Sequence, residues 1–160
     1  MLRTLEPKLA PRALVIGDDS TFPSMSDYLA HVHSDDVADH LVPPELGDLG
    51  EELRTHLHRL TEFLTDSDAG AVLRALVGQA QHDPAVATRL RTEYLVQQRE
   101  RDRLLLDRAV QRGELPADTD VDTALDQLLG PLYYRVLVTG EPAPASFTEA
   151  LVEHFLSSRR

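Results

Sequence analysis

Apolar residues recur at helical spacing from Asp48 onward. In the first such stretch, leucines follow one another at intervals of three or four residues, at positions 49, 53, 57, 60 and 64. This period places them on one face of an α-helix. Asp48 is suited to cap the N-terminus, with Glu51 three residues later as a capping-box partner. The pattern therefore predicts an amphipathic helix that begins just after Asp48.

Proline and glycine divide the following residues into further helices. A second apolar stripe covers residues 72–81, and a third helix begins at Pro84 and continues to about Arg112. Gly113 is suited to the left-handed C-terminal cap of this long helix. The polar stretch 97–103 within it indicates either a bend or a solvated outer face.

A fourth helix opens at Asp118 or Asp120 and carries apolar residues on more than one face as far as Leu137. Such a helix needs two packing partners. Pro131 removes one backbone hydrogen bond within it, so we expect a kink there. A last helix follows from about Ser146.

No segment after Asp48 shows the alternation that is typical of a strand. We therefore expect an all-α bundle of about five or six helices. Residues 46–160 would form this domain, and residues 1–45 an atypical, partly helical N-terminal segment. A chain of 160 residues is long enough for one sizeable apolar core.

The charge of the chain argues against DNA binding by these residues. Sixteen basic and 27 acidic residues give a formal net charge of -11, and neither side of Glu45 has a basic excess. Duplex DNA attracts proteins that place several Lys or Arg side chains against its phosphates. An acidic chain of this kind is repelled by the same phosphates.

Other absences in the sequence narrow the classes of protein. There is no cysteine, which excludes disulfides, thiolate zinc sites and cysteine nucleophiles. The N-terminus has no signal-peptide pattern, and no apolar run approaches the roughly 20 residues of a membrane span. We expect a cytoplasmic protein that does not bind a membrane.

Short segments in the C-terminal two-thirds resemble one known family. They are Gln-His-Asp-Pro at 81–84, Arg-Gly-Glu-Leu at 112–115, Leu-Leu-Gly-Pro-Leu-Tyr-Tyr-Arg at 128–135 and Val-Thr-Gly-Glu-Pro at 138–142. In order and spacing they resemble the C-terminal regulatory domain of the TetR family of transcriptional regulators. The likeness covers about Asp48 to Phe155.

The resemblance implies a regulatory domain that senses a small molecule and dimerises. In that family an N-terminal three-helix unit, with an Ala-Gly-Val-Ser-like turn, reads the DNA. No such turn occurs before Asp48, so no residue here is assigned to DNA binding. We expect DNA as a partner only where an N-terminal helix-turn-helix is supplied. The alternative is an orphan small-ligand or metal-binding helical dimer with no DNA role.

The resemblance also implies that the last two helices pair with their twofold mates in a homodimer. The sequence supports this, because the final helix has an apolar stripe that a monomer would leave partly exposed. The expected interface residues are Leu132, Val136, Phe147, Leu151 and Phe155. In the alternative interpretation, the same residues fill the core of a monomer.

A third implication is a cavity for a small, apolar organic effector. Such pockets are mostly apolar, with a few polar groups that orient the ligand. Tyr94 and Gln98, one helical turn apart, are placed to offer it hydrogen bonds. The candidate lining residues are Leu57, Leu60, Leu76, Tyr94, Gln98, Leu125 and Tyr133, with ordinary packing as the alternative for each.

Metal binding and catalysis have weaker support. Within ten residues lie His31, His33, Asp35, Asp36, Asp39 and His40. Histidine and carboxylate suit zinc or nickel, but such acidic clusters are usually solvated, so we assign no metal ligand. The sequence has no phosphate loop, no nucleophile elbow and no HExxH helix. His56 and His58, two residues apart, are expected to face different sides of one helix and suggest no site. We expect no enzymatic activity and no cofactor.

Overall fold

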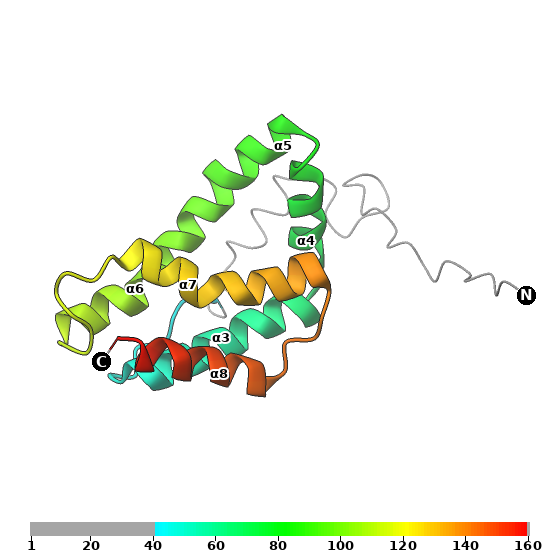
Figure 1. Cartoon of the computed structure of the whole chain (residues 1–160). Coiled ribbons are helices and arrows are strands. Elements are labelled where there is room, and N and C mark those ends of the chain that lie inside the picture. The colour runs from blue at the N-terminus through cyan, green and yellow to red at the C-terminus, as the bar shows by residue number, and fades with distance from the viewer. Residues whose placement is uncertain (1–40, 160) are drawn as a thin grey trace, which may run out of the picture.

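A computed structural model of the chain describes residues 41–159, which form helices and loops and contain no strand (Figure 1). This confirms the all-α class. The elements are α3 (Leu49–Asp66), α4 (Asp68–Ala80), α5 (Pro84–Arg89), η1 (Leu90–Leu95), α6 (Val96–Gln111), α7 (Val121–Tyr133), η2 (Tyr134–Thr139) and α8 (Ala145–Ser157). Elements α5, η1 and α6 are continuous, as are α7 and η2.

Side-chain caps explain where the helices begin. Asp48 accepts a hydrogen bond from the backbone N–H of Glu51 at 2.8 Å, as the sequence predicts. Of the two aspartates considered for α7, Asp120 is the cap, and it accepts from the N–H of Thr123 at 3.1 Å. The carboxylate that reaches back over the start of α3 is that of Glu52, which accepts from the N–H groups preceding Asp48.

Two segments, η1 and η2, have the wider turns of a π-helix. In η1 the N–H of Val96 donates to the carbonyl of Arg91, five residues earlier. Segment η2 begins three residues after Pro131, which lies inside α7. The hydrogen-bond pattern therefore changes to that of a π-helix three residues after Pro131, while the chain stays helical to Thr139, and the kink expected at Pro131 stays a prediction. Turns of this kind occur frequently at functional sites in proteins.

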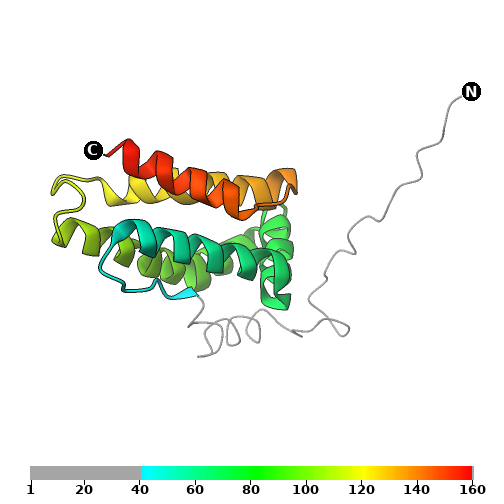
Figure 2. The same cartoon turned by 90° about the horizontal axis from the view of Figure 1, so that it is seen from below.

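The helices pack in two layers. Figure 2 shows α7 and α8 in one layer over α3 and α6, with α4 across one end. The leucine stripe of α3 faces inward between them, and Leu53, Leu57 and Leu64 are completely buried. Helix α3 thus contacts α4, α6 and α8, and forms the centre of one continuous apolar core.

Helix α4 approaches α3 closely where the two helices meet. A Cβ atom at Gly70 would lie 1.9 Å from the carbonyl oxygen of Phe63. No side chain fits in that space without moving the backbone. Gly70 is therefore required for the sharp connection at Ser67, which places α4 across the end of the bundle.

Candidate ligand pocket

A buried carboxylate lies at the centre of the candidate site. Asp102 on α6 is 3% exposed, and its Oδ1 is 2.9 Å from Nε2 of His56 on α3. The side-chain amide of Gln98, one turn earlier on α6, donates to the same oxygen at 2.9 Å. Burying an ionisable group without partners is costly, so these two contacts are what permit Asp102 to lie in the core.

The orientation of the Gln98 amide is fixed by its neighbours. Its Nε2 donates to Asp102 and, at 3.4 Å, to the carbonyl of Leu41. Its Oε1 must then point away from the carboxylate, and this buried oxygen has no hydrogen-bond partner among residues 41–159. Gln98 therefore presents a free acceptor although the residue is only 3% exposed.

A pocket of about 420 Å³ opens between α6 and α7 beside this cluster. Gln98 and Asp102 form its polar side, and Leu95, Leu125, Leu129 and the ring of Tyr133 form its apolar side. The volume lies within the range of small-molecule sites in proteins, and so does the combination of an apolar wall with a few polar groups.

Two phenols lie close to the carboxylate. Burial raises the pKa of Tyr94, and the negative charge of Asp102 raises it further. Burial likewise raises the pKa of Tyr133 well above its ordinary value, with added contributions from Asp102 and Tyr94. Both hydroxyls therefore stay neutral at physiological pH.

An ion-pair network between α6 and α7 lies at the rim of the pocket. Arg99 contacts Asp126 at 2.7 Å and Asp122 at 3.3 Å, and Arg103 also pairs with Asp122. These side chains are about half exposed, so each pair contributes little to stability. Their effect at the rim is to hold the Arg99 guanidinium against α7, away from Asp102.

The structure separates the seven residues expected to bind a ligand into three groups. Gln98, Leu125 and Tyr133 line the pocket. Tyr94 is buried near Asp102. The other three, Leu57, Leu60 and Leu76, are fully buried in the central core and do not line this pocket, which agrees with their alternative interpretation as packing residues.

The expected dimer residues also divide into two groups. Leu132 and Phe155 are 0% and 4% exposed, so they already fill the core of the single chain. Val136, Phe147 and Leu151 are half-buried. More apolar surface lies on η2, where Tyr134 is 61% and Val138 is 69% exposed.

Sequence reasoning missed the two residues that organise the site. From its spacing, His56 is predicted only to face a different side of its helix from His58. The stretch 97–103, which contains Asp102, is predicted to be a bend or a solvated outer face. A signal was present, because His56 lies three residues after Leu53 and four before Leu60, on the buried stripe. Asp102 follows Gln98 by four residues and Tyr94 by eight, so all three share one face of the helix.

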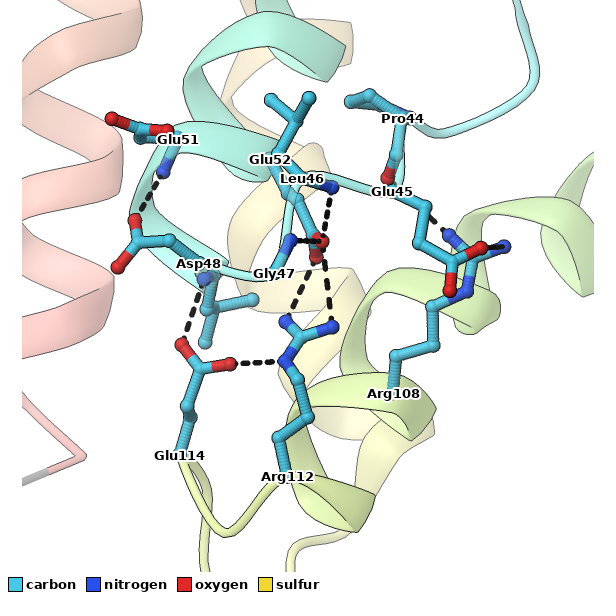
Figure 3. Close-up of polar contacts among 11 residues, drawn as sticks. Pro44, Glu45, Leu46, Gly47, Asp48, Glu51, Glu52, Arg108, Arg112 and Glu114 are labelled. Atoms are coloured by element: carbon cyan, nitrogen blue, oxygen red, sulfur yellow. Dashed lines mark hydrogen bonds and ion pairs between the residues drawn. The ribbon is translucent and has the colours of Figure 1, made fainter.

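A second polar cluster fixes the segment that enters α3 (Figure 3). The fully buried carboxylate of Glu52 accepts from the N–H groups of Leu46 and Gly47 at 2.8 and 2.9 Å. Arg112, at the end of α6, donates to it at 3.0 Å and also pairs with Glu114. We call this group, formed by Leu46, Gly47, Glu52, Arg112 and Glu114, the α3 clasp.

The α3 clasp is completed by contacts from both helices. Glu114 accepts from the N–H of Leu49 at 2.7 Å, and Arg108 donates to the carbonyl of Pro44 at 3.3 Å. Burial raises the pKa of Glu52, but the hydrogen bonds from two backbone N–H groups and Arg112 outweigh it and hold the pKa below its ordinary value. Glu52 is therefore ionised at neutral pH, and the clasp joins α6 to residues 44–52.

The metal-site hypothesis lies outside the described part of the chain, since all six of its residues are before residue 41. Within residues 41–159, no group of three or more His, Cys, Asp or Glu side chains could hold a metal ion. None of the helices in this range has the length and apolarity needed to cross a membrane.

Comparison with known proteins identifies the domain. The family model for the tetracyclin repressor-like C-terminal domain matches residues 43–155. The chain belongs to the TetR family. Among solved structures, the TetR family transcription regulator SCO0332 has a TM-score of 0.74 and 33% identity, over 84% of this chain and 74% of that one. The TetR C-terminal fold expected from the sequence is thus confirmed.

The curated relatives of this TetR domain are transcriptional regulators. YdeS of Bacillus subtilis, an HTH-type transcriptional regulator, is 33% identical over 116 residues, which are 72% of this chain and 58% of that protein. The HTH-type regulator Rv1556 of Mycobacterium tuberculosis is 24% identical over 134 residues, 82% of this chain and 64% of its own length. The chain therefore spans about three-fifths of the length of these relatives.

Proposed function

We propose that this chain is the effector-sensing and dimerising part of a TetR-type transcriptional regulator, working in the cytoplasm. The effector would bind in the pocket between α6 and α7, against Leu95, Leu125, Leu129 and Tyr133. The observation that carries the proposal is the oxygen of Gln98, which has no partner within residues 41–159 and lies beside an apolar wall. A buried acceptor left unpaired is costly, and a ligand that supplies a donor would remove the cost.

In this proposal the effector acts by shifting a population. A ligand favours one arrangement of the helices only as far as it binds that arrangement more tightly. The α3 clasp supports a route for the change, because Gln98 and Asp102 lie on the same helix as Arg108 and Arg112. Contact with DNA would be made by a helix-turn-helix region, as the names of the relatives suggest, and not by residues 41–159.

The second part of the proposal is a symmetric dimer through the outer face of α7, η2 and α8. Tyr134 and Val138, one turn apart on η2, are exposed, and Phe147 of α8 is half-buried. Arg135 stacks over the ring of Phe147 at 4.5 Å and joins the two helices. A patch of large apolar side chains at this position is typical of a surface that another chain covers.

Titration with N-phenyl-1-naphthylamine, a neutral apolar dye, tests the pocket. We expect saturable fluorescence with one site per chain, and affinity reduced severalfold by Leu95→Ser, because Leu95 is 38% exposed and lines the pocket. Leu104→Ser is the matched control, since Leu104 is 40% exposed on the same continuous helix but lies away from this pocket. Dye fluorescence that does not saturate, or equal losses in the two variants, would contradict a preformed ligand site.

A further inference from the structure

The polar side of the pocket consists of hydrogen-bond acceptors. Asp102 Oδ1 is occupied by His56 and Gln98, whereas Oδ2 accepts no hydrogen bond from residues 41–159. The oxygen of Gln98 is also free among these residues, and both donor hydrogens of its amide are directed at Asp102 and Leu41. Two acceptor oxygens from adjacent turns of α6 therefore remain for a ligand.

The arginine that lines the pocket does not pair with either of these oxygens. Arg99 lines the pocket, but its guanidinium is directed to Asp122 and Asp126 on α7. The described lining residues other than Arg99 carry no positive charge, and two of them, Asp102 and Asp126, are acidic. With a chain charge of -11, the electrostatic environment favours a cation over an anion.

We propose that the effector class is an apolar organic cation, a protonated amine with a hydrophobic body. The ammonium group would donate to Asp102 Oδ2 and Gln98 Oε1, and the body would pack on Leu95, Leu125 and Leu129. The rings of Tyr133 and Tyr94 add aromatic surface next to the charge, which is also favourable for a cation. An ammonium has only donors, so it matches the two free acceptor oxygens of Asp102 and Gln98. This inference rests on the proposed ligand-sensing function.

Three probes of one shape test the inference on the full chain. They are 4-phenylbutylamine, 4-phenyl-1-butanol and 4-phenylbutyrate, which differ in charge at one end, and their affinities are measured by calorimetry at neutral pH. We expect the amine to bind at least about tenfold more tightly than the alcohol, because hydrogen bonds to charged groups are stronger, and the acid to bind most weakly. Equal binding of amine and alcohol, or tighter binding of the acid, overturns the cation class and leaves the pocket intact. If none of the three binds, the pocket itself and the proposed function fall together.

Substitution of the carboxylate assigns the effect to Asp102. Asp102→Asn keeps the shape, and we expect it to weaken amine binding by on the order of tenfold to hundredfold while alcohol binding changes little. Glu100→Gln is the matched control, because Glu100 is exposed on the same helix and does not line the pocket. An equal loss in both variants would mean that the general acidity of the surface, and not Asp102, selects the amine.

A measurement on the unaltered protein remains decisive if the Asp102→Asn variant does not fold. With methyl-labelled leucine, the amine should shift the NMR signals of Leu125 and Leu129, which line the pocket, and leave those of Leu104 unchanged. Shifts confined to leucines away from the pocket would overturn the assignment of the site.

Discussion

The α3 clasp allows one stability prediction to be worked out in detail. In Glu52→Gln the side chain keeps its size but loses its charge, and an amide NH₂ replaces an oxygen that accepts from the backbone or from Arg112. One or more buried donors then lose their partner. Removing one member of a buried ion pair costs about 3–5 kcal/mol. Arg112 is 27% exposed and keeps Glu114 as a partner, so we expect a smaller loss of about 2–3 kcal/mol.

Urea unfolding followed by circular dichroism at 222 nm measures this loss. Glu51→Gln is the matched control, because the Glu51 side chain is exposed and only its backbone N–H bonds to Asp48. This substitution should change the free energy of unfolding by less than about 0.5 kcal/mol. The reasoning is refuted if Glu52→Gln unfolds at the same urea concentration as the control.

The pH dependence provides an independent check. The folded-state pKa of Glu52 is lowered, so its contribution to stability is complete above the ordinary value of 4.5 and is lost as the pH falls through the folded pKa. The difference in free energy of unfolding between wild type and Glu52→Gln should therefore be constant near neutrality and shrink on acidification below about pH 4.5. A difference that grows on acidification would contradict an ionised Glu52 in the clasp.

Two further outcomes test the dimer and the packing of α4. Val138→Lys should lower the sedimentation coefficient at micromolar concentration, because a charge in the interface favours the monomer. Leu104→Lys, at another exposed apolar position on α6, should leave the coefficient unchanged. A Val138→Lys dimer of normal stability would exclude η2 from the interface. In thermal unfolding, Gly70→Ala should destabilise the fold by several kcal/mol, because the new Cβ meets the carbonyl of Phe63. Gly78→Ala is the control, since Gly78 is exposed in the same helix with free space around its Cβ, and it should stabilise the fold by about 0.5–1 kcal/mol. Similar melting temperatures for these two glycine variants would mean that α4 can move away from α3.

The sequence predicted helices and their ends well because those features depend on neighbours in the chain. The Asp48 cap, the left-handed Gly113 and the leucine stripe of α3 all follow from local spacing. Glu52 was harder to foresee, since the carboxylate that reaches back over the start of α3 was expected to be that of Glu51. Which of the two glutamates reaches back depends on the position of Arg112, which comes from the end of α6. The spacing of residues within α3 does not predict that position.

The candidate pocket illustrates the same limit. Three of the residues expected to bind a ligand, Gln98, Leu125 and Tyr133, line the pocket between α6 and α7, and their binding role stays a prediction. Leu57, Leu60 and Leu76 have the same pattern but are packed in the core, because depth below the surface depends on how the layers stack. The partnership of His56 with Asp102 joins residues 46 positions apart, and only the assembled fold brings them together.

Helix α6 is held at two places along its length, by the Gln98 and Asp102 contacts near its start and by Arg108 and Arg112 near its end. Because an α-helix is stiff along its axis, a tilt at one end of α6 is accompanied by a tilt at the other end. A displacement of Asp102 would therefore also move the contacts of α6 with Pro44 and Glu52. The loop from Pro44 to Asp48 is then the place where a change inside the bundle would first reach the preceding part of the polypeptide.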